Sequence, residues 1–368
     1  MTAPDDGTLA ANAAVSLRPG ERTPDGLHIE RVRDARADWD AAVAAFPGST
    51  FCHRSGWQRI MSGVLRHECI YLRAHDGAGA WRGVLPLVRV RSILGHYLVS
   101  VPFLNDGGPL GDDAARRALV GYAVAEAQRS GAGLLELRSR ETIPGPVSAS
   151  HRKVTVHLEL PDSVDTLWSK TFKAKLRSQI RRSSKEGMTA RSGPTEIEPF
   201  YGVLARNMRD LGTPVLPRAF FEQIATEFGP SAIFSTVYTS SGAPAAAGCS
   251  LQWQNEIEIV WASSLREYNR FSPNMLLYAH VMEESIARGA TIFNFGRCTP
   301  GSSTHAFKLQ WGGHDVALAW PYWSRSGSVG TPTPSPDRPV FRLATTLWSH
   351  LPLAVTNRLG PALARQLP

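Results

Sequence analysis

Two stretches of this sequence, about 160 residues apart, share one pattern. Residues 131–138 read Gly-Ala-Gly-Leu-Leu-Glu-Leu-Arg, and residues 289–297 read Gly-Ala-Thr-Ile-Phe-Asn-Phe-Gly-Arg. In each, glycine follows a helical pattern, an apolar strand comes next, and arginine stands at the end of the strand. The spacing is far longer than the roughly 20–50 residues of a solenoid repeat. The pattern therefore indicates that a whole domain has been duplicated.

The segments before each stretch follow the same order of elements. Turn-forming residues separate short apolar runs, which predicts strands followed by a helix in each half. Asp112 and Asp113 can cap the first helix, which Gly131 ends, and Pro273 suits the first turn of the second helix. The expected helices span residues 112–130 and 273–288. The expected strands are residues 69–73, 83–90, 96–101, 134–138, 232–238, 246–253, 256–262 and 289–295.

The length of 368 residues favours two domains of about 150 residues each, with additional tails. We expect an α/β (α+β) architecture in which each domain has a mixed central sheet flanked by helices. The first domain is expected at residues 27–160, after a disordered lead-in at 1–26, and the second at 161–323. A Gly-, Ser-, Thr- and Pro-rich linker at 324–338 and a helical tail at 339–368 complete this organisation.

Several classes of protein do not fit the sequence. No stretch has the ~18 uninterrupted apolar residues of a membrane-spanning helix, and the first residues lack the basic and apolar runs of a secretory signal. The cysteines are widely separated, with neither CxxC spacing nor a cluster of histidines suited to zinc. We therefore expect a cytoplasmic protein with reduced thiols and no metal site.

Residues 164–187 have a helical pattern and carry seven cations between Lys170 and Lys185. The net charge of +8 over the whole chain also favours an anionic partner such as RNA, a nucleotide or a lipid surface. A solvated helix face with long side chains is one explanation of these cations. The other is contact with the phosphates of a donor substrate, through Lys173, Lys175, Arg177, Arg181 and Arg182.

The tail at residues 341–367 has the pattern of one or two short helices, with breaks expected at Pro352 and Pro361. We expect its apolar residues to dock onto the body of the protein, and contact with a membrane surface is the alternative. The residues concerned are Leu343, Leu347, Trp348, Leu351, Leu353 and Val355.

The segment Phe293-Asn-Phe-Gly-Arg297, followed by Phe307-Lys-Leu-Gln-Trp-Gly312, resembles the C-terminal signature of the FemAB-like family. The resemblance covers most of residues 45–325 and is greatest to members associated with exosortase and polysaccharide systems. Other similar stretches are Phe51-Cys-His-Arg-Ser-Gly-Trp57, Ser100-Val-Pro-Phe-Leu-Asn-Asp-Gly-Gly-Pro109, Leu211-Gly-Thr-Pro-Val, Trp261-Ala-Ser-Ser and Ser272-Pro-Asn-Met-Leu-Leu-Tyr.

The resemblance implies two tandem GNAT-like acyltransferase domains with a channel across them. The implied activity is amide-bond formation between an activated aminoacyl group, carried by aminoacyl-tRNA, and an amine-bearing acceptor, without a further cofactor. A lysine in the family's Phe-Lys pair assists catalysis, so this role passes to Lys308.

This chemistry requires a deprotonated amine, a stabiliser for the tetrahedral oxyanion and a proton donor for the leaving group. Lys308 and Arg297 can supply positive charge, and Asp106 could bind or deprotonate the acceptor amine. A structural carboxylate could instead hold Arg297, and turn formation alone would explain the glycines beside Asp106. The candidate substrate-binding residues are Phe307, Gln310, Trp311, Asn294, Trp261, Asn105, Trp57 and His53.

Two other functions also fit the sequence. The first is an N-acyltransferase that uses acyl-CoA or a carrier protein and acts on an amino sugar or a natural-product amine. The turn at residues 266–274 lacks the glycines that usually wrap the CoA pyrophosphate, although a helix N-terminus still attracts anions. The second is a non-catalytic module that binds an anionic polysaccharide precursor or recruits partners to the membrane.

Overall fold

The computed structural model describes residues 22–327 and 339–367. Most of the expected lead-in and of the expected linker at 324–338 therefore lies outside the described residues. Residues 22–26 form a turn in which the Leu27 N–H donates to Thr23 Oγ1 at 2.9 Å. Among the described helices, none combines the length and apolar character needed to cross a membrane.

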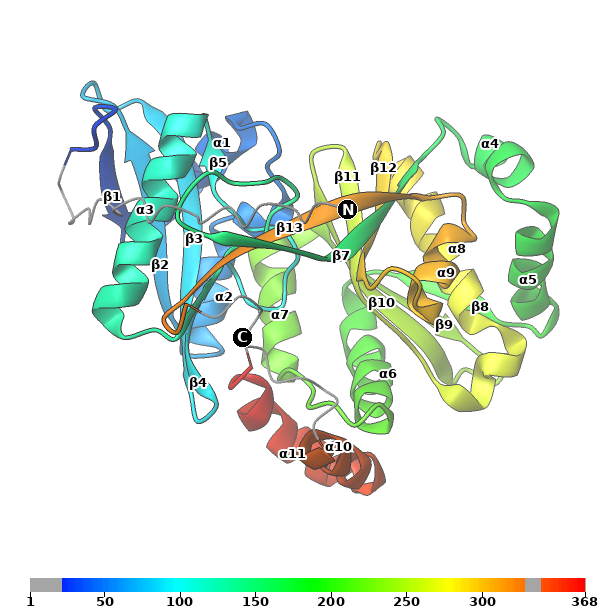
Figure 1. Ribbon diagram of the computed structural model, residues 1–368. Coiled ribbons are helices and arrows are strands. Elements are labelled where there is room, and N and C mark those ends of the chain that lie inside the picture. The colour runs from blue at the N-terminus through cyan, green and yellow to red at the C-terminus, as the bar shows by residue number, and fades with distance from the viewer. Residues whose placement is uncertain (1–21, 328–338, 368) are drawn as a thin grey trace, which may run out of the picture.

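One sheet of thirteen strands runs through the molecule (Figure 1). The strands are β1 (His28–Val32), β2 (Glu68–His75), β3 (Trp81–Ser92), β4 (Gly95–Val99), β5 (Leu110–Gly111), β6 (Leu134–Glu136), β7 (Ser148–Glu159), β8 (Thr189–Ser192), β9 (Ala232–Tyr238), β10 (Pro244–Trp253), β11 (Glu256–Ser264), β12 (Ile292–Cys298) and β13 (His314–Ser324). Their order in space is β1-β2-β3-β4-β6-β13-β7-β12-β11-β10-β9-β8, and β5 pairs with β3 outside this path. The pairs β4–β6 and β11–β12 are parallel and the other pairs are antiparallel, so the sheet is mixed.

Helices flank this sheet (Figure 1). They are α1 (Ala37–Ala45), α2 (Gly56–Gly63), α3 (Asp113–Ser130), α4 (Val164–Thr166), α5 (Ala174–Lys185), α6 (Ile197–Asp210), α7 (Arg218–Phe228), α8 (Pro273–Ala287), α9 (Ser303–Leu309), α10 (Pro339–His350) and α11 (Leu353–Ala364). α3 connects β4 to the parallel strand β6, and α8 connects β11 to the parallel strand β12. This repeated order bears out the expected duplication and the α/β fold class.

The ends of α3 follow the rules read from the sequence. Asp112 accepts a hydrogen bond from the Ala115 N–H at 2.9 Å, which satisfies one of the free donors in the first turn. Gly131 ends the helix with φ of 76°, a conformation that favours glycine. The strand expected at residues 96–101 stops at Val99, because Val101 has φ of 49° and cannot continue an extended strand.

β7 and β13 join the two halves of the molecule. β7 pairs with β13 along most of its length, and residues 154–159 of β7 also pair with β12 in the second half. The far end of β13 pairs with β6 in the first half, where Tyr322 lies opposite Glu136. The last strand of the sequence therefore lies in the middle of the sheet, which passes between the halves without a break (Figure 1).

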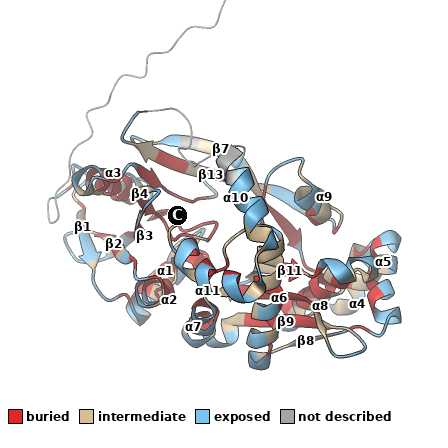
Figure 2. Cartoon of the chain, turned by 90° about the horizontal axis from the view of Figure 1, so that it is seen from below, coloured by how far each residue is buried: buried red, intermediate tan, exposed pale blue. Residues whose placement is uncertain are grey.

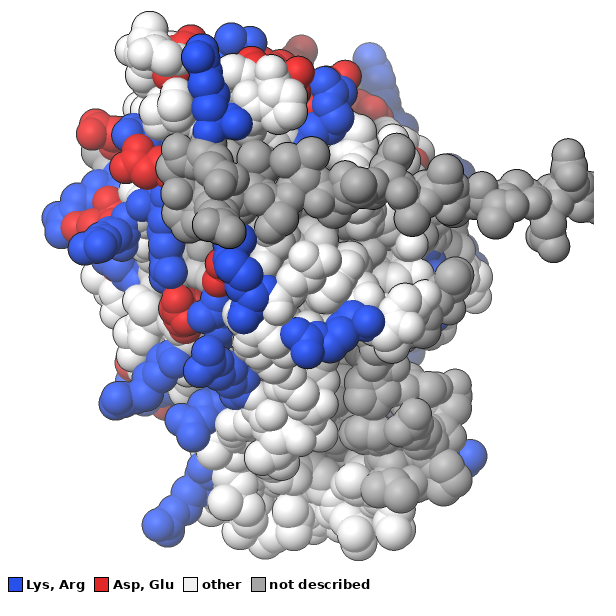
Figure 3. Space-filling view, turned by 60° about the vertical axis from the view of Figure 1, so that its left-hand side comes forward, with Lys and Arg blue, Asp and Glu red and all other residues white. Residues whose placement is uncertain are grey.

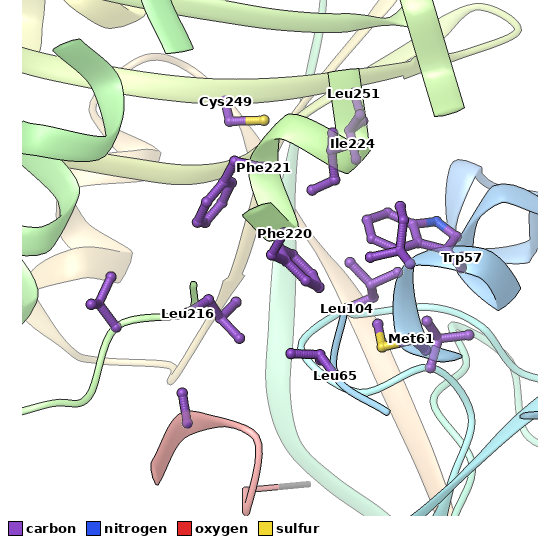
Figure 4. Close-up of a cluster of buried hydrophobic side chains, with 14 of the residues drawn as sticks. Trp57, Met61, Leu65, Leu104, Leu216, Phe220, Phe221, Ile224, Cys249 and Leu251 are labelled. Atoms are coloured by element: carbon purple, nitrogen blue, oxygen red, sulfur yellow. The ribbon is translucent and has the colours of Figure 1, made fainter. Parts of the chain in front are cut away.

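The halves also share a hydrophobic core between α2 and α7 (Figure 4). Trp57 is fully buried, and its ring centroid lies 6.1 Å from that of Phe220 and 4.9 Å from that of Phe228. The helices approach so closely that a Cβ atom on Gly56 would lie 2.7 Å from the Phe228 ring. Trp57, a residue expected to bind substrate, therefore packs in the core.

The helical pattern at residues 164–187 is interrupted. A π-helical turn at Leu167–Thr171 follows α4, and Phe172 is extended before α5 begins. The Phe172 side chain is buried against Trp168 and Trp311, which favours the break. Arg177 donates to the carbonyl oxygens of Trp168 and Phe172 at 3.2 and 2.6 Å and so satisfies acceptors that the helix leaves free.

The tail forms two helices that lie against α6 (Figure 2). The break expected at Pro352 is present, but the break expected at Pro361 is wrong, because α11 continues through that residue. Packing of Thr356, Gly360 and Ala364 against the body supports the helix despite one lost hydrogen bond. These small residues dock, whereas Leu343, Leu347 and Val355, which we expected to dock, are exposed.

Candidate functional site

The parallel strands β11 and β12 separate partway along their length. Residues 256–258 pair with 292–294, and beyond this point a bulge at Gly296, with φ of 72°, diverts β12. A cavity of about 300 Å³ opens between the two strands. The first half of the chain contributes Phe103 and Asn105 to its wall. The second half contributes residues that include Trp261, Tyr278, Phe295, Arg297, Thr304 and Lys308.

A second cavity, of about 340 Å³, adjoins the first and shares Ala262, Tyr278 and Thr304 with it. Phe307 lines this second cavity, and its ring packs edge-on against Tyr278 with centroids 5.1 Å apart. Asn274, in the first turn of α8, also lines it. The two cavities together form a site that reaches from the junction of the halves to the N-terminus of α8.

Lys308 is held at the wall of the first cavity by α9, and its side chain is buried. Its Nζ donates to the carbonyl oxygens of Gly296 at 2.5 Å and Arg297 at 2.9 Å. Burial lowers the pKa of Lys308 to about 8, although Cys298 and Glu258 oppose this effect. A neutral lysine amine has two N–H groups and one lone pair. With both N–H groups held by carbonyl oxygens, the lone pair remains free for a ligand.

Arg297 lines the same cavity with an exposed side chain. Its guanidinium carbon lies 5.4 Å from the centroid of the Trp320 ring, on which Arg138 also packs at 4.9 Å. Within residues 22–327 and 339–367, the Arg297 guanidinium has no carboxylate partner. The alternative that a structural carboxylate holds Arg297 therefore has no support among these residues, and its charge is available to an anionic ligand.

A buried carboxylate network lies directly behind the cavity wall. Glu258 accepts hydrogen bonds from Asn105 Nδ2 at 2.5 Å and from Asn294 Nδ2 at 3.1 Å. Asn294 Nδ2 also donates to Glu256 at 2.8 Å, and Glu256 receives two hydrogen bonds from Arg140 at 2.6 and 2.8 Å. Burial raises the pKa of Glu258 to about 7, and the charge of Glu256 adds to this rise. Asn105 and Arg140 come from the first half, so only the folded protein assembles this network.

Asp106 and His53 face a smaller cavity of about 90 Å³ in the first half. Asp106 Oδ2 forms an ion pair with Arg140 Nε at 2.8 Å, and burial raises the pKa of Asp106 to about 6. His53 Nδ1 accepts from the Thr50 N–H, so Nε2 carries the proton that is donated to Gly108 O at 3.0 Å. Burial lowers the pKa of His53 to about 4, which keeps the ring neutral. Arg140 links this cavity to the carboxylate network.

The loop at residues 100–109 carries Asn105 to Glu258 and is strained. Val101 and Phe103 have φ of 49° and 69°, which is unusual for residues other than glycine. The Arg138 N–H donates to Ser100 Oγ at 2.8 Å, and the Arg138 guanidinium donates to Leu104 O at 2.9 Å. These contacts hold the strained loop over the end of β6.

The other residues that we predicted for the site lie in different places. Trp261 lines the first cavity, whereas Trp311 is fully buried in the core of the second half. Gln310 lies at the end of α9, is half-buried, and lines neither of the two adjoining cavities. Asn294 is buried and does not line the cavity; its Nδ2 donates to the two glutamates, and its Oδ1 accepts from the N–H of Gly296, which lines the first cavity, at 2.8 Å.

The basic helix α5 packs against α8, whose residues Asn274 and Tyr278 line the second cavity. The Ser183 hydroxyl lies 2.7 Å from Phe271 O and 2.8 Å from Ser272 O, at the N-terminal end of α8. Of the five cations predicted to contact donor phosphates, Lys173, Lys175, Arg181 and Arg182 are exposed, whereas Arg177 is partly buried by its structural hydrogen bonds. Lys170 and Lys185 are exposed as well.

Glu256, Glu258 and Arg140 were not predicted from the sequence as site residues. A usable signal was present, because residues 256–260 read Glu-Ile-Glu-Ile-Val and side chains alternate between the faces of a strand. Both glutamates must therefore lie on one face of β11, which is an internal strand of the sheet. Buried carboxylates require hydrogen-bond or cationic partners, so this alternation marks a polar site.

We expect Glu258→Gln to change how stability depends on pH. The raised pKa means that folded Glu258 binds its proton more tightly than the unfolded chain between pH 4.5 and about 7. The contribution of this residue to the free energy of unfolding therefore falls by about 3 kcal/mol as pH rises through that window. Urea unfolding measured at pH 5 and at pH 7.5 should show that the free energy of unfolding falls less between these two pH values in the variant than in the wild type.

Glu196→Gln is the matched control, because Glu196 is also buried but accepts a hydrogen bond from Tyr238, far from this network. If the free energy of unfolding falls equally with rising pH in the wild type and in Glu258→Gln, then Glu258 is not the group whose titration causes the fall.

Comparison with known proteins finds similarity in the part of the chain that lines the two cavities. Residues 170–309, which include β11, α8, β12 and α9, match the acetyltransferase (GNAT) domain family. No curated protein matches the chain.

Several solved structures are similar in fold. FemX has a TM-score of 0.58 and 14% identity, over 79% of this chain and 96% of that one. The C-terminal domain of a putative lysylphosphatidylglycerol synthetase from Agrobacterium fabrum has a TM-score of 0.51 and 14% identity, over 74% and 92%. A tandem GNAT protein from the clavulanic acid biosynthesis pathway has a TM-score of 0.51 and 14% identity, over 83% of this chain and 100% of that one. The chain thus shares its fold with FemX and with a tandem GNAT protein, and residues 170–309 match a GNAT acetyltransferase domain.

Proposed function

We propose that this protein is an aminoacyltransferase that joins an aminoacyl group, delivered by aminoacyl-tRNA, to an amine-bearing acceptor. The observation that carries the proposal is the pairing of Lys308 with Arg297 in one cavity. Lys308 has a pKa of about 8 and a free lone pair when neutral, and Arg297 has no carboxylate partner among the described residues. A base and a free cation are two requirements of acyl transfer to an amine.

In the proposed reaction, the nitrogen of the acceptor amine attacks the ester carbonyl carbon. At the same time, neutral Lys308 accepts a proton from that amine. A C–N bond forms, and Arg297 stabilises the negative charge that develops on the carbonyl oxygen. The ester C–O bond then breaks, and the Lys308 ammonium returns the proton to the leaving ribose oxygen. Protons and charges balance without a metal or another cofactor.

The surroundings of the site support a separate place for each substrate. The exposed cations on and beside α5 suit a polyanionic donor that enters through the second cavity. Phe103 and Asn105 of the first half line the cavity that also contains Lys308, so an acceptor bound on that side would bring its amine to Lys308. We therefore assign the donor to the second half and the acceptor to the first half.

The second candidate is an acyl-CoA-dependent N-acyltransferase, and the separation of β11 from β12 favours it. Beyond Glu258, β11 pairs with β10 on one edge only, which leaves backbone groups for an amide-containing arm. The second cavity also reaches Asn274 at the N-terminus of α8, where a phosphate would be favoured. The matching GNAT domain family is compatible with this donor as well.

Filter binding to charged and uncharged tRNA across a salt series, beside calorimetry with acetyl-CoA, tests the donor. We expect the wild type to prefer charged tRNA over uncharged tRNA. The triple variant Lys175→Gln, Arg181→Gln, Arg182→Gln should bind at least tenfold more weakly at low salt, because it loses contacts with phosphates. For the same reason, its affinity should depend less on salt. The control is Arg33→Gln, Arg36→Gln, Arg117→Gln, which neutralises three exposed cations of the first half. Tight CoA binding without preference for charged tRNA would favour the second candidate.

A further inference from the structure

Large apolar side chains are exposed mainly at one end of the molecule. Of the nine that are exposed among the described residues, seven lie on α10, on α11 or at the tip of the β3–β4 hairpin. A monomeric protein usually scatters such residues singly, and a cluster of them marks an interaction surface. The seven, which we call the apolar end face, are Ile93, Leu94, Leu343, Leu347, Val355, Leu359 and Leu363.

The three elements of the apolar end face are in contact or adjacent. The Ile93 N–H, at the hairpin tip, donates to Gln366 Oε1 just after α11 at 3.3 Å. α10 and α11 both pack against α6 and are joined by a short turn at Leu351 and Pro352. Figure 1 places the hairpin tip and both helices at the same end of the molecule, and Figure 2 shows that most of both helices is exposed.

After Leu353, which packs against the core at its start, α11 turns its small residues inward and its large residues outward. Thr356, Gly360 and Ala364 are buried, and a Cβ atom on Gly360 would lie 3.1 Å from the Val215 N atom. Val355, Leu359 and Leu363 recur every four residues along the same helix and are 38%, 48% and 41% exposed. A helix that served only to cover the body would bury its large apolar residues, because their burial stabilises the fold most.

The charge around the apolar end face is entirely positive along the tail. Residues 339–367 contain Arg342, Arg358 and Arg365 but no aspartate or glutamate. All three arginines are exposed, and none forms an ion pair with another described residue; Arg91, at the base of the hairpin tip, is exposed as well. In Figure 3, the described atoms in the lower part of the molecule, at the height of α10 and α11 in Figure 1, are mainly white, with Lys and Arg toward the edges.

We propose that the apolar end face docks the protein onto a bilayer that contains anionic lipid. Leucine and isoleucine side chains exposed on helices and on a hairpin tip can enter the boundary between headgroups and acyl chains, while flanking arginines contact lipid phosphates. A second copy of the chain fits this face less well, because a two-fold interface would bring together two tail surfaces that carry arginines and no carboxylates. The inference does not depend on the proposed aminoacyl transfer.

Flotation of the full chain with vesicles tests this proposal. We expect binding to vesicles of phosphatidylcholine with 30% phosphatidylglycerol, much weaker binding to pure phosphatidylcholine, and weakening as salt is raised. Leu343→Gln, Leu347→Gln and, separately, Leu359→Gln, Leu363→Gln should each weaken binding at least tenfold. These side chains are exposed, so melting temperatures should stay at the wild-type value. Arg358→Gln should weaken binding about fivefold, which corresponds to ~1 kcal/mol for one cation at the surface.

Lys175→Gln, Arg181→Gln on α5 is the matched charge control, since it removes two exposed cations from a different element and should leave vesicle binding unchanged. Two results would overturn the proposal. One is absence of binding to anionic vesicles by the folded wild type. The other is dimerisation that the leucine variants abolish, measured by sedimentation, without an effect on vesicle binding.

Discussion

Lys308→Arg and Lys308→Met are both expected to lower the rate of amide formation by about 10²–10⁴-fold, the range for loss of a general base. Arginine keeps the positive charge but is not deprotonated in proteins, so it can replace a cation but not a base. In the wild type, neutral Lys308 is the active form, and burial sets its pKa at about 8. The logarithm of kcat/KM should therefore rise with pH and level off near pH 8. Rates measured across this pH range, with labelled donor under single-turnover conditions, would show this rise and its plateau.

The comparison between these two variants distinguishes the possible roles of Lys308. If the side chain acts only as a cation, Lys308→Arg will keep activity within about tenfold of the wild type and Lys308→Met will not. If its hydrogen bonds to the Gly296 and Arg297 carbonyl oxygens are merely structural, the melting temperature will fall along with the activity. Loss of activity in both variants at an unchanged melting temperature is the expected outcome.

Arg297→Gln is expected to lower kcat by about 10²–10³-fold, the loss seen when a donor to a developing oxyanion is removed. The physical reason is that the Arg297 guanidinium lines the cavity and forms no ion pair with a carboxylate of the described residues. Its charge is therefore available to the transition state. Steady-state kinetics should show a decrease in kcat that exceeds any increase in KM for the acceptor.

Arg191→Gln provides the control for this change. Arg191 also packs over an aromatic ring, with its guanidinium carbon 5.2 Å from the centroid of Tyr238, but it lies on β8 at the far edge of the sheet. Its substitution should leave kcat within twofold of the wild type. A large increase in KM with little change in kcat for Arg297→Gln would mean that Arg297 binds an anionic group of a substrate equally in the ground state and the transition state.

Much of the local structure could be predicted from the sequence. Asp112 and Gly131 mark the ends of α3, and β9 and β10 form where strands were expected at residues 232–238 and 246–253. These features depend on contacts between residues close along the chain, so a short segment contains the information. The interrupted helix before α5 was not predicted, because the burial of Phe172 depends on Trp311, which is distant in the sequence.

The site was predicted less completely. Lys308, Arg297, Asn105 and Trp261 line one cavity, but their assignment to a common site came from a family resemblance and not from their spacing. Trp57 was assigned to substrate binding, yet it packs in the core that joins the halves. An aromatic residue has the same sequence signal in a pocket wall and in a core, so only its neighbours in space decide between the two.

The sequence by itself determined the duplicated order of strands and helices, the caps of α3, the basic character of α5 and the cationic tail, because these are properties of single segments. The tertiary structure alone decided that β13 returns to the first half, that Asn105 and Arg140 meet Glu258 and Glu256 across the junction, and that α11 exposes its large residues. The physical reason is that burial determines these roles. It lowers the pKa of Lys308, raises that of Glu258 and requires partners for buried charges, and it exists only when distant segments pack together.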